Sequence, residues 1–385
     1  MRTTPVMTLV VGDRFVPARL LAEQLAAAGQ GAGLAFAIRQ LELPYPTSPT
    51  IPVPSSQGDS TIRAFWEEID SIAARSPEDA SDPTLREYTG PVDALVPEVG
   101  EVEVLVLHAA PVSRGVVEAA GALRVVGTVR TGPVNVNIDA LSDRGIPLFS
   151  CPGRNATAVA EFIIGALVSH VRGIVEAAHR LRQGRWSLEP WEIDAAGPEL
   201  NGRTCGLVGF GRVGRALAPI ARGLGMDLLV SDPYVDGSDI RTAGARPVEL
   251  HELLQRADVV VLVARLTAYN RQLIDRAALR LLKPTAIVVN TARSQLVDTS
   301  ALAEALHEGK IGGAVVDVFD QEPPPADNPL MTAPRTLLTP HIAGATRDTV
   351  HRGARMVADS IVGYLRSGSL EHCVNAADLR GSVKT

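Results

Sequence analysis

The sequence predicts an α/β fold of two domains, each with a parallel sheet flanked by helices. The chain has 385 residues, of which 46% are apolar, and this is enough for about two domains of ~100–200 residues. Strand-like apolar runs alternate with helix-length segments in two series, which the loop at 183–200 separates. Such alternation is typical of parallel strands joined by right-handed crossovers.

The first series has strand patterns at 6–13, 34–41, 102–110, 122–130 and 145–153. The run "VEVLVLHAA" is almost continuously apolar, which suits a strand covered on both faces. Residues 43–97 interrupt the series and begin with "LPYPTSPTIPVPSSQGDS", a segment too rich in proline and serine for regular structure. With only a short helix predicted at 62–74, this segment is interpreted as an elaboration of the first domain.

The second series begins after a long helix pattern that runs from 156 to 182. Its strand patterns are 204–211, 227–232, 258–264, 285–292, 313–319 and 336–341. A last helix pattern at 346–365 is expected to return to the first domain. The predicted domains are therefore 1–151 plus 345–385, with the elaboration at 43–97, and 152–344.

Charge and cysteine content narrow the function classes. The net charge is −6 and the arginines are scattered, so no nucleic-acid partner is expected. The longest apolar runs are shorter than the ~18 residues of a membrane span, and no membrane partner is expected. Three distant cysteines in no metal-ligand spacing predict no metal site and a reducing, cytoplasmic compartment. Cys205, within a strand pattern, is predicted to be buried.

The strongest local motif is G-x-G-x-x-G, formed by Gly209, Gly211 and Gly214 between a strand and a helix pattern. The first glycine permits a tight turn, the second lets the backbone approach a pyrophosphate, and the third allows close helix packing. The amides of Arg212 and Val213 would point at the phosphates from a helix N-terminus.

Asp232 ends the next strand pattern, 18 residues after the last glycine of the motif. Its carboxylate would bind the adenosine ribose and repel a 2′-phosphate, which favours NAD over NADP. An ordinary strand–turn–helix connection and a methyltransferase cofactor site are the alternatives at this point, because both can contain a glycine turn.

Three further residues end successive strands of the same domain: Arg293, Glu322 and His341. Taken singly, Glu322 before three prolines reads as a solvated side chain, and His341 as a satisfied core residue. Together they supply what hydride transfer to a 2-keto acid needs. An arginine binds the carboxylate, a histidine protonates the carbonyl oxygen, and a carboxylate orients the imidazole. This combination argues against the methyltransferase alternative.

The chain from about 102 to 365 resembles the D-isomer-specific 2-hydroxyacid dehydrogenases, close to their phosphoglycerate dehydrogenase branch. The resemblance rests on five ordered motifs: "NIDALSDRGIPLFSCPGRNATAVAEF", "ELNGRTCGLVGFGRVGR", "NTARSQLVD", "GGAVVDVFDQEPPP" and "LLTPHIAGAT". It implies a Rossmann-type NAD-binding domain inserted in a flavodoxin-like substrate domain. It also implies a small anionic 2-keto or 2-hydroxy acid as substrate.

The resemblance further implies roles for individual residues. Arg293, Glu322 and His341 would be catalytic, and Asp317 would contact the nicotinamide carboxamide. Other residues would line the cofactor (Thr291, Ala292 and Gly344) or the substrate (His108, Ala109, Arg130, Thr131 and Gly132, with Arg293). The helix from Ala156 would pack in a homodimer interface, and no regulatory domain is expected after residue 385.

Two positions depart from the family pattern. Val134 stands where a second glycine is usual, and Arg265 where many members have proline. Arg265 is interpreted as a surface residue or, alternatively, as a second cation near the cofactor or an anionic substrate. Two other functions therefore stay open: the same scaffold acting on a phosphonate or phosphite, and a non-catalytic NAD(H)-sensing protein.

Overall fold

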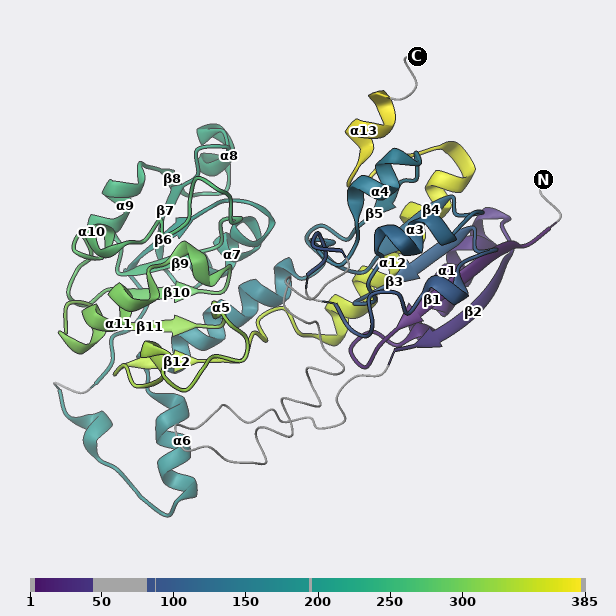
Figure 1. Ribbon diagram of the computed structural model, residues 1–385. Coiled ribbons are helices and arrows are strands. Elements are labelled where there is room, and N and C mark those ends of the chain that lie inside the picture. Colours follow the sequence, from purple (N-terminus) through teal and green to yellow (C-terminus); the bar gives the residue numbers. More distant parts are fainter. Residues whose placement is uncertain (1–3, 44–81, 87, 194–195, 382–385) are drawn as a thin grey trace. The chain divides into compact units, whose positions relative to one another are not determined.

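The computed structural model describes residues 4–43, 82–86, 88–193 and 196–381 (Figure 1). The helix predicted at 62–74 lies outside these residues. The chain divides into two compact units. Unit 1 contains the N-terminal part of the chain as far as Arg154 together with Thr346–Thr385, and unit 2 contains Asn155–Ala345. The predicted limits of the second domain were 152 and 344.

Unit 1 is built on a five-stranded sheet in the order β2-β1-β3-β4-β5, in which all neighbours are parallel. This order is the flavodoxin-like one. The strands are β1 (Val6–Gly12), β2 (Phe36–Glu42), β3 (Val104–Leu107), β4 (Val125–Thr128) and β5 (Leu148–Phe149).

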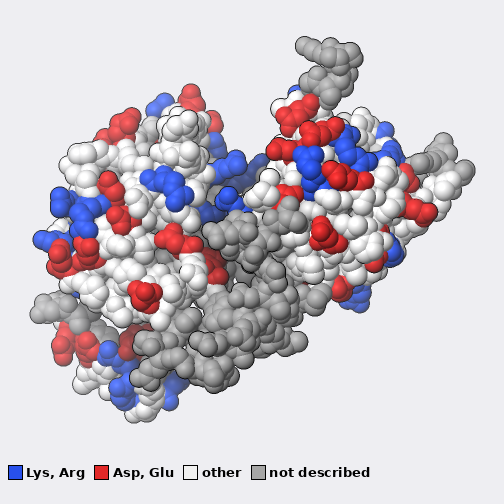
Figure 2. Space-filling model, in the orientation of Figure 1, with Lys and Arg blue, Asp and Glu red and all other residues white. Residues whose placement is uncertain are grey.

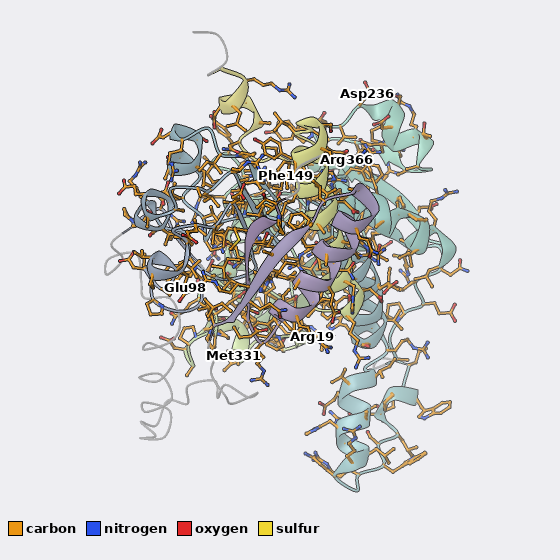
Figure 3. The ribbon with its side chains drawn as sticks, turned by 90° about the vertical axis from the view of Figure 1, so that its right-hand side faces the viewer. Arg19, Glu98, Phe149, Asp236, Met331 and Arg366 are labelled. Carbon is orange, nitrogen blue, oxygen red and sulfur yellow. The ribbon has the colours of Figure 1, made fainter. Side chains whose placement is uncertain are left out.

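The two faces of this sheet bury separate cores because successive side chains along a strand point to opposite faces. One core is closed by α1 (Ala18–Ala32) and α12 (Arg347–Ser367), and the other by α3 (Arg114–Ala119) and α4 (Ile138–Asp143). Phe149 of β5 lies in the interior, with its ring centroid 5.9 Å from that of Tyr364 of α12 (Figure 3). The short elements are η1 (Val96–Glu98) and α13 (Ala376–Gly381).

Unit 2 has a seven-stranded parallel sheet in the order β12-β11-β10-β9-β6-β7-β8. This is the Rossmann order with one extra strand, β12. The strands are β6 (Thr204–Val208), β7 (Asp227–Ser231), β8 (Arg246–Pro247), β9 (Val259–Leu262), β10 (Ile287–Asn290), β11 (Gly313–Val316) and β12 (Thr336–Leu338).

Helices cover both faces of this sheet. One face packs against α5 (Ala156–Val171), α7 (Arg212–Gly223) and α8 (Gly237–Thr242). The other face packs against α9 (Leu250–Arg256), α10 (Arg276–Leu279) and α11 (Thr299–His307). Two 3₁₀ turns, η3 (Ser294–Leu296) and η4 (Pro329–Met331), complete this side. The predicted α/β architecture with two parallel sheets is confirmed.

The helix pattern predicted from 156 to 182 is in fact two helices, so this part of the prediction was wrong. Helix α5 ends at Val171, and α6 (Ile174–Arg182) follows at an angle of 64°. Gly173 lies between them in the left-handed region, with φ 58°, where a glycine is unstrained. Helix α6 buries none of its residues, and η2 (Glu189–Trp191) follows it.

The three cysteines are free thiols, and Cys205 is buried in β6 as predicted, with 2% of its surface exposed. Burial raises the pKa of Cys151 and of Cys205 to about 12. In the part of the chain that the structure describes, no single helix is long and apolar enough for a membrane span, and only the bent α5–α6 pair meets these criteria jointly. Acidic and basic side chains are interspersed over much of the face in Figure 2.

Candidate active site

The carboxyl edge of the unit 2 sheet collects the residues that the sequence singled out in this part of the chain. Ligands of open parallel sheets bind at this edge, because the loops that leave the strands meet there. The glycine loop follows β6, Asp232 follows β7, and Arg265 follows β9. The remaining strands lead to Thr291, Ala292 and Arg293 after β10, Asp317 and Glu322 after β11, and His341 after β12.

The glycine loop has the geometry that the fingerprint predicts. Gly209 has φ 99°, and a Cβ there would lie 2.7 Å from the backbone nitrogen of Ala264. A Cβ on Gly214 would lie 2.9 Å from the carbonyl oxygen of Gly209. At Gly211, by contrast, no atom of the described residues beyond its own chain neighbours lies within 4 Å of the Cβ position. The loop therefore needs glycine for packing at two positions and leaves the third open to a ligand.

Helix α7 begins at Arg212, and Gly211 before it offers no side-chain cap. No side chain of the described residues therefore caps the first backbone N–H groups of this helix, which lie at the positive end of the helix dipole. Asp232 stands beside the loop, since its carboxylate accepts hydrogen bonds from the amides of Phe210 at 2.7 Å and Tyr234 at 2.9 Å. A fixed negative charge therefore adjoins the glycine loop.

A buried polar atom without a hydrogen-bond partner in the described part of the chain indicates a ligand site at another strand end, after β10. The hydroxyl oxygen of Thr291 is buried and has no hydrogen-bond partner among the residues that the structure describes. Asn290 fixes the following turn, because its amide accepts from Ala292 N at 3.1 Å and donates to Arg293 O at 2.9 Å. Together with the open glycine loop, the free hydroxyl fits a dinucleotide. Gly344 lies against Asn155, whose Nδ2 would be 2.8 Å from an added Cβ.

His341 and Glu322 form a hydrogen-bonded pair. Nδ1 of His341 lies 2.7 Å from Oε2 of Glu322, and Oε1 of the same carboxylate accepts from Phe319 N at 3.0 Å. The side chains are 47% and 38% exposed, so water partly screens their charges. With Nδ1 engaged, the free Nε2 of His341 is the atom that can exchange a proton with a substrate.

The contact between His341 and Glu322 shifts the pKa values of both side chains. The hydrogen bond to Glu322 raises the pKa of His341, against the opposing effects of burial and of the Arg293 charge, and the charges of Glu322 and Asp317 add to the rise. Burial by itself would raise the pKa of Glu322. The hydrogen bonds from His341 and Phe319 and the charges of His341 and Arg293 outweigh it, so this pKa is lowered. The result favours an imidazolium beside a carboxylate.

Asp317 anchors the loop that carries His341. Its carboxyl group is fully buried and accepts from Thr339 Oγ1 at 2.7 Å, Ile342 N at 2.9 Å and Ala343 N at 2.8 Å. His341 itself has φ 53°, a left-handed backbone that is strained for a histidine and is held by this loop. Sequence reasoning missed this structural role, and the contact of Asp317 with the carboxamide stays a prediction.

Arg293 is exposed within unit 2. Among the residues that the structure describes, its guanidinium donates only to the adjacent carbonyl of Ala292, from Nη1 at 2.6 Å, so most of it is available to a ligand. Its charge is close enough to lower the pKa of Glu322 and of His341, which places it near the pair. Arg265 is also exposed, and its side chain makes no hydrogen bond or ion pair with any described residue.

The remaining predicted residues belong to unit 1. His108 and Ala109 follow β3, and Arg130, Thr131 and Gly132 follow β4, so they share the carboxyl edge of that sheet. Sequence reasoning missed Asp13, which is 2% exposed and binds both residues after β3. Its Oδ2 lies 2.8 Å from Nδ1 of His108 and accepts from Ala109 N at 3.2 Å. The signal was present in "VVGD", an acidic residue that directly follows an apolar strand.

Comparisons with known proteins agree with this geometry. The family model "D-isomer specific 2-hydroxyacid dehydrogenase, NAD binding domain" matches residues 164–343. The chain is 37% identical over 265 residues to the glyoxylate reductase of Korarchaeum cryptofilum, covering 69% of this chain and 80% of that protein. It is 35% identical over 289 residues to the D-3-phosphoglycerate dehydrogenase of Methanocaldococcus jannaschii. That match covers 74% of this chain and 54% of the other, so the chain spans about half the length of that relative.

Solved structures support the same fold. The TT0316 protein of Thermus thermophilus aligns with a TM-score of 0.70 at 27% identity, over 96% of this chain and 100% of that one. The D-lactate dehydrogenase of Escherichia coli aligns with a TM-score of 0.68 at 22% identity, over 96% and 100% of the two chains. With the fingerprint, the strand orders and a relative covered over most of its length, these matches confirm the expected family and its NAD cofactor. The chain therefore belongs to the D-isomer specific 2-hydroxyacid dehydrogenase family, a family of NAD-dependent oxidoreductases, and unit 2 carries its NAD-binding domain.

Proposed function

We propose that this chain interconverts a small anionic 2-keto acid and the corresponding D-2-hydroxy acid, with Arg293, Glu322 and His341 as its catalytic residues. The 2.7 Å contact between His341 and Glu322 carries the proposal, because it prepares a proton donor at the edge where the cofactor fits. Arg293, at the next strand end, supplies a cation for the carboxylate of the substrate.

The residues act in a defined order during reduction. Arg293 binds the substrate carboxylate with its fork of N–H donors and thereby orients the adjacent carbonyl group. NADH, when bound, supplies the hydride. His341 donates its Nε2 proton to the carbonyl oxygen, which becomes the hydroxyl group. Glu322 holds Nδ1–H and stabilises the imidazolium before transfer; in oxidation, neutral His341 accepts the proton back.

The cofactor would be held by backbone and side chains of unit 2. The amides of the glycine loop and of Arg212 and Val213 would bind the pyrophosphate at the start of α7. Thr291, Ala292, Asp317 and Gly344 would line the nicotinamide side, where the hydroxyl of Thr291 needs a partner. In unit 1, we propose His108, Ala109, Arg130, Thr131 and Gly132 as substrate-binding residues.

The first test is a panel of 2-keto acids, from glyoxylate through hydroxypyruvate to branched and aromatic acids. Turnover is followed by the loss of NADH absorbance. We expect turnover of at least one member. If no member reacts although NADH binds, the chain is not this enzyme and an NAD(H)-sensing role is favoured. Oxidation of a phosphonate or phosphite by NAD+, followed by a gain of NADH absorbance and without turnover of any keto acid, would favour the other alternative, in which Arg265 is a second cation.

The pH dependence of reduction tests the proton donor. Activity should fall as pH rises through the pKa of His341, because only the imidazolium can donate. The hydrogen bond to Glu322 raises that pKa above its usual 6.5, so activity should persist above this pH. Glu322→Gln removes the negative charge and should move the descending limb to lower pH in a kcat/KM profile. A limb that stays in place would exclude His341 as the titrating donor.

Cofactor choice tests Asp232. Its carboxylate repels a 2′-phosphate, so wild type should prefer NADH to NADPH. Asp232→Asn keeps the side-chain size and removes the charge, and should shift the NADH/NADPH ratio of kcat/KM by about tenfold toward NADPH. Asp236→Asn, at the exposed start of α8, is the matched control because its carboxylate caps its own helix by accepting from Ser238 N at 2.7 Å and does not directly follow β7, as Asp232 does. An unchanged ratio in Asp232→Asn would remove Asp232 from cofactor selection.

We further propose a cytoplasmic homodimer. Free buried thiols support a reducing compartment. The dimer is supported by a segment of 174–193 with seven large apolar side chains that are 48–89% exposed: Ile174, Val175, Leu181, Trp186, Leu188, Trp191 and Ile193. A groove of about 980 Å³ lies beside it, at the amino ends of β9, β10 and β12. Contiguous exposed apolar surface of this kind usually meets a partner.

Sedimentation equilibrium tests the dimer. The wild-type chain should sediment as a dimer, and Trp186→Ser with Trp191→Ser should shift it toward the monomer. A wild-type chain that sediments as a monomer at micromolar concentration would contradict the proposal. The proposed cytoplasmic location is tested by directing the chain into an oxidising compartment, which should lower the yield of folded protein.

A further inference from the structure

The segment that presents His341 at the edge of the unit 2 sheet is a tight turn after β12. Thr339 extends the pairing of β12 by one residue, since its backbone N–H donates to the carbonyl of Val316 at 3.0 Å. Pro340 follows, and the N–H of His341 donates back to the carbonyl of Thr339, also at 3.0 Å. A hydrogen bond between residues two apart closes a turn of this kind. The chain therefore turns sharply at the proton donor.

This turn gives His341 a backbone that needs support. Its φ of 53° lies in the left-handed region, where a residue with a Cβ is strained unless the surrounding structure holds it. The imidazole is 47% exposed, and its hydrogen bond within the described part of the chain joins Nδ1 to Glu322 at 2.7 Å. The position of the free Nε2 therefore depends on how firmly the backbone of the turn is held.

One buried carboxylate holds the turn on both sides of the histidine. Oδ1 of Asp317 accepts from Oγ1 of Thr339 at 2.7 Å on the near side, and from the N–H of Ile342 at 2.9 Å on the far side. Oδ2 accepts from the N–H of Ala343 at 2.8 Å. Asp317 is itself fixed to the sheet, because its N–H donates to the carbonyl of Asn290 at 3.0 Å. These three hydrogen bonds to the carboxylate form a clamp on the turn.

The hydroxyl of Thr339 is the side-chain member of this clamp. The other two donors are backbone N–H groups, which belong to the chain whatever side chain stands there. Because Asp317 has no exposed surface, bulk water cannot take the place of a donor that is lost, and the lost hydrogen bond has its full cost. Removal of the hydroxyl would therefore release the near side of the turn from the carboxylate.

We propose that Thr339 is a positioning residue: its hydroxyl, through Asp317, holds the turn so that Nε2 of His341 meets the carbonyl oxygen of the substrate. This inference rests on the proposed function, in which His341 is the proton donor. Thr339 touches none of the reacting atoms, so its effect is transmitted by geometry alone. Geometry is sufficient, because a misplacement of about 1 Å can lower a rate by about a hundredfold.

The test removes the hydroxyl and keeps the shape of the side chain. Thr339→Val should lower the single-turnover rate of keto-acid reduction by about ten- to a hundredfold. Its affinity for NADH, measured by fluorescence titration, should stay as in wild type, because the lesion concerns the proton donor. Thr339→Ser brings the hydroxyl back and should restore the rate to within about threefold of wild type.

Thr336→Val is the matched control, because it makes the same substitution three residues earlier, in β12. There, Oγ1 of Thr336 donates to the carbonyl of Ala333 at 3.1 Å. This variant should lose about as much melting temperature as Thr339→Val and keep the wild-type rate. The proposal is overturned if folded Thr339→Val keeps its rate, or if serine does not restore it. A parallel loss of NADH affinity in Thr339→Val would also overturn it, since the hydroxyl would then act on the cofactor.

A measurement that needs no turnover separates this inference from the proposed function. With isotope-labelled histidine, the imidazole NMR signals of His341 are identified by their absence in His341→Asn. They should match wild type in Thr339→Ser and Thr336→Val, and should shift or broaden in Thr339→Val. If no keto acid is turned over but this pattern is seen, the reaction is wrong and the positioning role stands. If turnover occurs and the signals are the same in all these threonine variants, the positioning role is wrong and the reaction stands.

Discussion

His341→Asn is expected to lower kcat for keto-acid reduction by about 10²–10⁴-fold, because the variant has no side chain that can donate a proton to the carbonyl oxygen. Asparagine is chosen because the backbone here has φ 53°, a conformation that asparagine tolerates well. The loss should appear in single-turnover kinetics, and NADH should still bind with its wild-type affinity.

The control for this variant is His307→Asn. His307 is exposed at the end of α11, at the opposite edge of the sheet, and its replacement should leave kcat unchanged. If His341→Asn retained more than a tenth of the wild-type kcat while folded, a different group would have to donate the proton. The circular dichroism spectrum and melting temperature establish whether the variant is folded.

Arg293→Ala is expected to lower kcat/KM for the keto acid by about 10²–10³-fold, since two charge-assisted hydrogen bonds to the carboxylate are lost. Arg293→Lys keeps the charge and loses the fork, and should fall between the alanine variant and wild type. Because the guanidinium is exposed and its one hydrogen bond within the described part of the chain goes to the neighbouring carbonyl, neither change should destabilise the fold.

The same variants distinguish an enzyme from a sensor. In an enzyme, Arg293→Ala abolishes most turnover and spares NADH binding, which can be measured by fluorescence titration. If wild type and Arg293→Ala had the same kcat/KM for every keto acid, the arginine would not hold the carboxylate. Arg280→Ala, at the exposed end of α10, is a control for the loss of a positive charge from the same unit.

The sequence was sufficient for features that repeat along the chain. Continuous apolar runs alternating with helices predicted both parallel sheets, and residues at strand ends predicted which side chains share an edge. The pairing of His341 with Glu322 followed from this logic, because β11 and β12 are neighbours in the sheet. The glycine fingerprint was equally readable, since each of its glycines has a local backbone reason.

Features that depend on tertiary contacts could not be predicted in this way. Asp317 looks like any acidic residue at a strand end until its three bonds to the Thr339–Ala343 loop are seen. Gly173 breaks a helix whose apolar pattern continues through it, because the pattern records composition and not the left-handed backbone. The 2.8 Å contact between Asp13 and His108 joins residues that are 95 positions apart in sequence, and no local window contains both.

The state of the three thiols has a practical consequence for labelling. At neutral pH, a pKa of about 12 leaves on the order of one molecule in 10⁵ ionised at Cys151 or Cys205, and thiolate is the form that alkylating reagents attack. Burial also raises the pKa of Cys373, but this thiol is partly exposed, so a reagent can reach it. A maleimide dye should therefore attach at Cys373 alone, without any mutagenesis. This residue lies at the end of the unit 1 sheet, where its backbone forms an isolated antiparallel bridge with Phe149. The natural chain is thus ready for fluorescence studies of unit 1.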